Sequence, residues 1–593
     1  MAMGNINGNG PGGVRMGSPV AGTFRGSTTI RPLVSVFRQA SEPNDPALGL
    51  NAYIVSMQTN KSIDGSPGTW EVTIKGSSMV PGSGPDSLSW DGVFAPNDWV
   101  TIAVADAAQG GRVWPIMLGL VDAVRSGFAT NDGARVRTWT LSGRDLTKCV
   151  ADTQITSAVY TAFDPVLSAG AAYRLVDALD RANSTLGNPS QIVPAVLSFL
   201  MGADVRPPNV SFWRVPRNLN ALFTGGAEPS VNQRQFTDVL DVRAYVAPAL
   251  PGRIAVNGNF GAENGLGNQV WDTLRSYSNA PLNELFIDFL PNQASDARSP
   301  LAYASTDGSL NGFVPALVLR ERPFPSLPDA IPHRGSAYDP WTALPTTTML
   351  TRDLESADLT QGAENYNFFL MQSGGISLPR NLFLEQSENP EDPLFAGVPA
   401  INRDSIQIHG VQRLELSTNY TGTGGDQDLS EFFGWTRLLR DWYGPCIEFY
   451  SGSITSVTIL PGVRVGERLI IGDLLGVSGG DVEFYIEGVA HSLAVINGVA
   501  QHRTTLTVTR GHQNPVAAVA AYAERFRRQG RSALAQDLGV EAEPVLDDAV
   551  RAAIRNVLAQ PLASEPTPLT GGPQGVTGTA PDGSTFAVPS ATE

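Results

Sequence analysis

A pattern of short β-strands occurs twice in this chain, at positions far apart, and it limits what the sequence can fold into. In the first copy Gly119 follows Trp99 by 20 positions, and in the second Gly488 follows Arg468 by the same number. Each copy continues into a segment in which threonine alternates with apolar residues, as in a half-buried strand. The segments are Trp99–Val104, Pro115–Val121 and Arg137–Gly143 in the first copy, and Arg468–Gly472, Phe484–Ala490 and Arg503–Gly511 in the second.

The repetition predicts two related β units in one chain. Such a chain can present two similar surfaces to a partner. This matters when the partner is a ring with more identical subunits than the assembly that this chain forms. Gene duplication without any symmetry role gives the same self-similarity, so the repeat by itself leaves both explanations open.

The charge balance of the chain is acidic. Its 593 residues include 41 Lys and Arg against 57 Asp and Glu, a formal net charge of −16. A chain of this length is expected to hold several domains. Non-specific nucleic-acid binding depends on lysine and arginine neutralising phosphates, so this composition argues against it. An acidic wall would instead let DNA pass without sticking.

Cysteine usage and apolar runs indicate an intracellular, non-membrane protein. Cys149 and Cys446 fall in different halves of the chain and form neither a disulfide framework nor a zinc signature, so we expect reduced thiols in a cytoplasmic assembly. The glycine-rich start, up to about Gly26, has the composition of a flexible arm and shows no secretory signal. No apolar run is long enough to cross a bilayer.

The order of strand, helix and loop patterns predicts five regions. They are a flexible arm (1–28), a first β-barrel (29–152), an α+β insertion (153–400), a second β-barrel (401–513), and helices with a disordered tail (514–593). Strands are predicted at 30–37, 52–57 and 70–75, and helices at 145–150, 171–181, 192–200, 270–277, 429–442, 516–528 and 545–559.

A hairpin turn is predicted in the second unit, because both positions of Asn497-Gly498 tolerate positive φ. Placing Ile496 opposite Val499 sets the register of the two long strands that flank the turn.

Several segments resemble the baseplate hub proteins of tailed bacteriophages, a family related to the base of type VI secretion spikes. The resemblance covers roughly residues 30–515 and rests on a pattern of strands and turns. Its pieces are Asn97–Val104, Gly119–Val124 and Leu141–Leu146 in the first unit, Pro281–Asp288 and Pro315–Phe324 between the units, and Ser405–Glu415, Phe432–Trp442, Pro461–Gly472 and Tyr485–Gly511 in the second.

The resemblance implies a mainly β protein with two tail tube-like β-barrels, an α+β insertion and C-terminal helices. It also implies a homotrimer whose six barrels adapt the sixfold tail tube to the threefold central spike. The implied partners are the tail tube or a distal tube-like ring, the spike or tail tip protein, and the C-terminus of the tape-measure protein. DNA would pass through the channel without specific binding, in a virion tail baseplate that assembles in the host cytoplasm and functions in genome ejection.

No residue is predicted to be catalytic, to bind a cofactor or to bind a metal. In the register set by Ile496 and Val499, His491 faces Thr504 and His502 faces Leu493. The two histidines are then diagonal neighbours on one strand face, and no third metal ligand is evident. Tryptophans and other aromatics in the repeat strands are expected in the barrel cores.

Two alternatives of other classes stay open. A cell-wall hydrolase built on the hub frame would need paired carboxylates, for which Asp353 with Glu355, or Glu385 with Glu391, are candidates without an orienting context. The segment Gly476–Gly480 matches a Gly-x-Ser-x-Gly motif, but the predicted strand after it does not suit a nucleophile elbow. A type VI spike base would need an OB-like domain and a β-helical needle after Gly511, where only helices and a low-complexity tail are expected.

Overall fold

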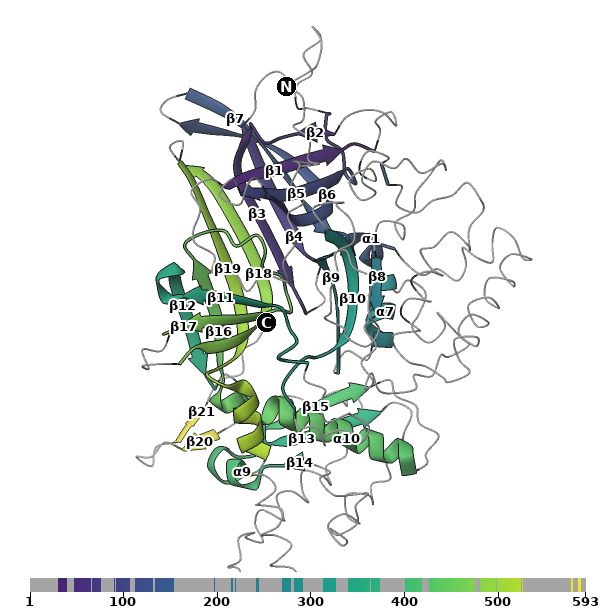
Figure 1. Cartoon of the computed structure of the whole chain (residues 1–593), viewed down its shortest axis with the longest axis vertical. Helices are drawn as coiled ribbons and strands as arrows, with labels where there is room; N and C mark the ends of the chain where they lie inside the picture. Colours follow the sequence, from purple (N-terminus) through teal and green to yellow (C-terminus); the bar gives the residue numbers. More distant parts are fainter. Residues whose placement is uncertain are drawn as a thin grey trace, which may run out of the picture. The chain divides into compact units, whose positions relative to one another are not determined.

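The structure is a computed structural model, and a large antiparallel sheet dominates it (Figure 1). It describes residues 30–39, 47–64, 67–75, 90, 92–106, 112–131, 134–153, 193, 197, 215–216, 219, 241–244, 269–278, 282–291, 313–326, 340–362, 364–373, 400–418, 426–474, 480–496, 499–523, 525, 577–579 and 585–587. The predicted arm (1–28), the helices at 171–181 and 545–559, and most of the helix at 192–200 lie outside the described residues.

The first unit contains seven strands. They are β1 (Ile30–Phe37), β2 (Leu48–Gly49), β3 (Ile54–Ser62), β4 (Thr69–Lys75), β5 (Trp99–Asp106), β6 (Arg112–Asn131) and β7 (Ala134–Asp145). Their order is β3-β4-β7-β6-β5-β1, with β2 beside β1. In β4 the buried residues Trp70, Val72 and Ile74 alternate with more exposed polar ones, which confirms the predicted half-buried strand.

The second unit repeats this arrangement with β11 (Thr346–Leu350), β12 (Leu354–Gln361), β16 (Tyr450–Ser456), β17 (Arg468–Gly472), β18 (Val482–Ile496) and β19 (Val499–His512). Their order is β12-β16-β19-β18-β17-β11, which is the same sequence of positions as in the first unit. The outer strands differ in direction, since β1 is antiparallel to β5 whereas β11 is parallel to β17. The strands β11 and β12 lie inside the range predicted as the insertion, so the sheet of the second unit begins before residue 400.

The two units join into one sheet of 13 strands because β18 pairs with β3 (Figure 1). β18 is long enough to do this. Its first residues, Val482–Tyr485, pair with β17, and its later residues, Gly488–Ala494, pair with β3 on the same side.

A small sheet between the units packs against both of them. It has the order β8-β10-β9, from β8 (Asp241–Ala244), β9 (Asn283–Pro291) and β10 (Phe313–Glu321), and the helix α7 (Val270–Ser278) packs beside it. β9 is buried on both faces, and side chains of a strand alternate between faces. Leu285, Ile287 and Phe289 therefore join the core that contains Trp114 of β6. The intervening Phe286 and Leu290 join the core of the second unit.

The remaining described elements are helices and short strands, and three of the strands form a second small sheet. They are α1 (Thr147–Ala151), η4 (Thr351–Asp353), β13 (Phe368–Ser373), β14 (Ala400–Ile401), α9 (Arg403–His409), β15 (Arg413–Thr418), α10 (Asp426–Tyr443) and η5 (Gly444–Glu448). The order of that sheet is β14-β13-β15. A separate unit, 528–593, contains the paired strands β20 (Thr577–Thr579) and β21 (Thr585–Ala587).

The described helices follow the predicted apolar spacing. In α10 the buried residues Trp435, Leu438, Leu439 and Trp442 recur at helical intervals and form one apolar face. α7 and the helical residues 515–523 also fall where helices were predicted. The prediction of a mainly β chain with few helices is confirmed. None of the described helices is long and apolar enough to span a membrane.

Candidate assembly interface

The corresponding strands β5 and β17 begin from the same turn. Asn97, two residues before β5, and Gly466, two residues before β17, have positive φ angles of 68° and 76°. The amide of Asn97 donates to the carbonyl of Val121 at 2.8 Å, and the amide of Gly466 donates to the carbonyl of Ile486 at 2.7 Å. The sequences of the two turns differ, yet their hydrogen bonds coincide.

An acidic residue follows in each turn and closes it. Asp98 Oδ2 accepts from the amide of Ala95 at 2.8 Å, and Glu467 Oε2 accepts from the amide of Arg464 at 3.1 Å. Burial raises the pKa of both carboxyl groups above their ordinary values, that of Glu467 to about 7. These carboxylates therefore shape the backbone and give the second turn a group that titrates near neutral pH.

Two threonine pairs fix the correspondence between the units residue by residue. The hydroxyls of Thr73 and Thr140 lie 3.1 Å apart across β4 and β7, and those of Thr455 and Thr505 lie 3.2 Å apart across β16 and β19. The same residue pairs are directly opposite one another in their strands.

Two β-bulges occur at equivalent places. One lies between Val121 and Ala123 in β6 and between Ile486 and Gly488 in β18; the other lies between Ile54 and Ser56 in β3 and between Leu354 and Ser356 in β12. Residues of β6 and β7 therefore correspond to those 365 positions later, as Val121 does to Ile486. Residues of β3 from Ser56 onward correspond to those 300 positions later in β12, as Ser56 does to Ser356.

This correspondence corrects the glycine spacing seen in the sequence. Gly119 corresponds to Phe484, not to Gly488. A Cβ at Gly119 would lie 2.3 Å from the carbonyl oxygen of Arg144 and 2.7 Å from Trp70 Nε1, so the glycine makes room for that backbone and for the Trp70 ring. The second unit has Gly452 at the position of Trp70 and no ring to accommodate. The equal spacing of 20 residues was a coincidence, although the repeated strands are real.

The junction between the units is the contact of β18 with β3. On its core face the buried residues Val489, His491 and Leu493 lie beside Thr59 and Met57. His491 is opposite Thr504 and His502 is opposite Leu493, as the sequence predicted. The turn residues 497–498 themselves lie outside the described residues.

His491 is a buried structural residue. Its Nδ1 lies 3.0 Å from Thr504 Oγ1. Burial lowers the pKa of His491 to about 3, and the nearby cations Arg464 and Lys61 act in the same direction. Its imidazole therefore stays neutral at physiological pH. In the described part of the chain, no group of three or more His, Cys, Asp or Glu is placed to hold a metal ion.

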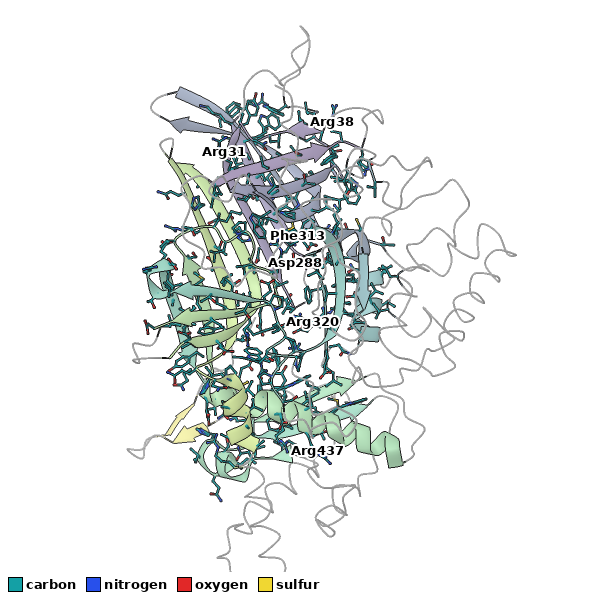
Figure 2. All side chains as sticks on the ribbon, viewed as in Figure 1. Arg31, Arg38, Asp288, Phe313, Arg320 and Arg437 are labelled. Carbon is teal, nitrogen blue, oxygen red and sulfur yellow. The ribbon has the colours of Figure 1, made fainter. Side chains whose placement is uncertain are left out.

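A buried ion pair ties this junction to the middle sheet. Lys61 Nζ of β3 lies 2.5 Å from Asp288 Oδ1 of β9, with side chains that are 11% and 2% exposed. Asp288 Oδ2 also accepts from the amide of Val465, in the turn before β17. One carboxylate therefore joins the first unit, the middle sheet and the second unit, and Figure 2 labels its position.

A second charged group joins β10 to the second unit. Arg320 Nε donates to Glu284 Oε2 at 2.9 Å, and Arg320 Nη2 donates to the carbonyl of Gly466 at 2.8 Å (Figure 2). The hydroxyl of Tyr485 donates to Glu284 Oε1 at 2.5 Å and accepts from Arg320 Nη2. Burial and the neighbouring Glu284 raise the pKa of Tyr485, so its phenol keeps its proton.

Arg464 links the second unit directly to the first. Its Nη2 donates to the carbonyl of Pro115 in β6 at 2.8 Å, and its guanidinium lies 5.4 Å from the ring centroid of Phe313. Both terminal nitrogens of this guanidinium donate to backbone carbonyls, Nη2 to that of Pro115 and Nη1 to those of Pro461 and Val463. The arrangement is suited to holding two units in one relative position.

The solved structures similar to this chain include three proteins of phage tails or secretion systems. The 43 kDa tail protein of prophage MuSo2 from Shewanella oneidensis aligns with 83% of this chain and 98% of its own, at 11% identity and a TM-score of 0.38. The tail protein from Neisseria meningitidis MC58 aligns with 81% and 96%, at 11% identity and a TM-score of 0.37.

The third is the E. coli c3393 protein, a component of the type VI secretion system with structural similarity to the T4 bacteriophage tail proteins gp27 and gp5. It aligns with 81% of this chain and 77% of its own, at 8% identity and a TM-score of 0.32. No family model and no curated protein sequence matches the chain.

The two described carboxylate candidates for a hydrolase have different partners. Asp353 Oδ2 accepts from the amide of Leu350, and Glu355 forms an ion pair with Arg503 at 2.7 Å. Glu385, Glu391 and the serine of the Gly-x-Ser-x-Gly match lie outside the described residues, while the strand predicted after that match is β18.

The aromatic residues of the repeat strands are core residues, as predicted. Trp99, Trp114, Trp139, Phe484 and Tyr485 are all buried. Both cysteines are free and buried. Burial raises the pKa of Cys446 to about 11 and that of Cys149 well above its ordinary value, so neither is a reactive thiolate.

The buried ion pairs were not predicted from the sequence. Their signal was available, because Glu284, Asp288 and Arg320 interrupt strands that are otherwise apolar. A charge within such a strand indicates a partner in the core, since an unpaired buried charge is strongly unfavourable. The partner itself could not be found, because Lys61 is 227 positions away from Asp288.

Proposed function

We propose that this chain is the structural hub of a phage tail, a homotrimer that adapts the sixfold tail tube to the threefold central spike. The supporting observation is that one strand order occurs twice and that β18 and β3 join the two copies side by side in one sheet. Three such chains would present six similar units to a hexameric ring and threefold symmetry to a spike.

The contacts between the units support a rigid adaptor. The ion pair of Lys61 with Asp288 and the group formed by Arg320, Glu284 and Tyr485 bind both units to the same middle sheet. Movement of either unit away from the middle sheet would break these ion pairs and their hydrogen bonds. A hub of this kind transmits force between ring and spike without changing its own shape.

The net charge of −16 suits a channel through which DNA moves. Phosphates are attracted to lysine and arginine and repelled by acidic surfaces, so an acidic ring does not retain DNA. The work of the hub is mechanical and needs no catalytic residue or cofactor. Its place is the tail baseplate of the virion, after assembly in the host cytoplasm, in contact with the tube or a tube-like ring, the spike and the tape-measure protein.

The solution mass of the full chain tests this proposal. The expected value is three times the 62.9 kDa of one chain, measured by light scattering or sedimentation. A stable monomer, or a ring with a different number of chains, would refute the threefold adaptor. Incubation with peptidoglycan tests the absence of catalysis, because turnover that disappears on carboxylate substitution would favour the hydrolase.

A further inference from the structure

Several strand edges of this sheet have no neighbour among the described residues, and two of them correspond to the strands of the internal junction. β6 pairs with β5 only as far as Leu120, so one edge of its later half, up to Asn131, has no neighbour there. β12 pairs with β16 on one side and with no described strand on the other. Free edges of this kind readily accept another strand.

The internal junction shows what covers the equivalent edges. In β18, residues Gly488–Ala494 pair with residues Ser62–Ser56 of β3. The bulges and threonine pairs show which residues correspond. Residues 123–129 of β6 correspond to Gly488–Ala494 of β18, and residues 356–362, which include most of β12, correspond to Ser56–Ser62 of β3. The two open edges are therefore the two halves of a second junction of the same kind.

Residues that are buried in the internal junction have exposed counterparts at the two open edges. Leu493 and Met57, opposite one another in the internal junction, are 1% and 0% exposed. Their counterparts are Phe128, which is 73% exposed, and Ala357, which is also exposed. Phe128 is thus a large apolar side chain that is left in solvent at the open edge of β6.

We propose that β6 of one copy pairs with β12 of a second copy, and that this contact repeats the β18–β3 junction between chains. The inference deepens the proposed function and rests on it, since it names the surface through which the copies join. The register follows from the internal junction: Val124 lies opposite Gln361, Arg125 opposite Thr360, and Phe128 opposite Ala357.

The core face of the proposed contact is apolar. Val124 and Leu359 are already partly buried at the margins of the two cores, and Phe128 would lie beside Ala357 with Leu359 as its diagonal neighbour. Burial of an aromatic side chain at such a place stabilises association through its apolar area. This face continues the cores that the internal junction joins.

The other face is complementary in charge. Arg125 and Asp358 are both exposed, and neither forms an ion pair within the described part of the chain. In the proposed register they are diagonal neighbours, a position from which a long side chain reaches an opposite charge. The complementarity favours a second copy over an unrelated strand.

Cysteine crosslinking of the full chain tests the register. Arg125, Ser126 and Thr360 are exposed, so cysteine at these positions should leave the fold intact. Arg125→Cys with Thr360→Cys places the two thiols directly opposite one another between chains. Oxidation should then give disulfide-linked dimers and trimers on a non-reducing gel. Both native cysteines are buried and should not interfere.

Two matched variants control the experiment. Ser126→Cys with Thr360→Cys is out of register by one residue and puts the thiols on opposite faces, so roughly tenfold less product is expected. Asn60→Cys with Ala490→Cys places thiols at the corresponding position of the internal junction, and should form a disulfide within one chain.

The outcomes separate this inference from the proposed function. A trimer without the crosslink, when the internal control does crosslink, overturns the β6–β12 contact and leaves the threefold hub standing. Crosslinking in a ring with another number of chains supports the contact and overturns the threefold hub. A chain that remains a monomer and forms no crosslink between copies overturns both.

Charge reversal gives an independent measurement. Arg125→Glu should weaken association of the copies roughly fivefold, and adding Asp358→Arg should restore it. Equal weakening by each reversal and no recovery in the double variant would overturn the assigned register.

Discussion

Replacing Lys61 by methionine removes one partner of the ion pair that joins the two units to the middle sheet. The methionine keeps the length and apolar stem of lysine but leaves Asp288 charged, 2% exposed and without its cation. Removing one member of a buried pair costs about 3–5 kcal/mol. The amides of Phe289 and Val465 still donate to Asp288, so the lower end, about 3 kcal/mol, applies here.

A second substitution distinguishes the charge from the packing. The amides of Phe289 and Val465 donate to different oxygens of Asp288, so Asp288→Asn keeps an acceptor for one of them and removes the negative charge. The double variant Lys61→Met with Asp288→Asn therefore has no unpaired charge. Its loss should be about 1 kcal/mol, so the double variant should be about 2 kcal/mol more stable than Lys61→Met alone. The exposed pair of Arg503 with Glu355 is the matched control, and Arg503→Met should cost under about 1 kcal/mol.

Urea unfolding at one chain concentration measures these differences, with midpoints compared through a common slope. A single variant Lys61→Met that loses no more than the Arg503→Met control would refute the reasoning, because it would show that Asp288 is not dependent on its buried partner. A double variant as unstable as the single one would show instead that packing, and not charge, makes the contact.

Three further perturbations follow from the buried groups. Glu467 has a folded-state pKa of about 7 against an ordinary 4.5, so its contribution to stability falls as pH rises between these values. The free energy of unfolding of Glu467→Gln should therefore rise by roughly 2–3 kcal/mol relative to wild type between about pH 5 and 8. Melting-temperature profiles of the two proteins that run parallel with pH would contradict this. Tyr485→Phe removes a hydroxyl from a buried carboxylate and should cost about 1.5–3 kcal/mol by urea unfolding, whereas an unchanged midpoint would count against that hydrogen bond. Gly143→Ala would place a Cβ 2.0 Å from the carbonyl of Leu120 and should lower the melting temperature strongly, while Gly127→Ala, with its nearest atom at 3.5 Å, should change it little; equal effects would contradict the assigned packing.

Local patterns in the sequence predicted the elements of this protein but not their alignment. The alternation in β4, the helical spacing of Trp435 and Trp442 in α10, and the register of His491 against Thr504 all depend on neighbours close in the chain. Such neighbours fix backbone geometry directly, so these predictions were confirmed. The match of Gly119 with Gly488 was wrong, because the glycine at 119 depends on Trp70, which lies on another strand.

The sequence by itself determined that the chain is mainly β and acidic, and that it carries one strand pattern twice. Only the tertiary structure decided how the two copies meet. β18 pairs with β3, and Lys61 finds Asp288 across a separation of 227 positions. The physical reason is that strand propensity and apolar alternation are local properties, whereas edge pairing and charge pairing join residues brought together only after the chain has folded.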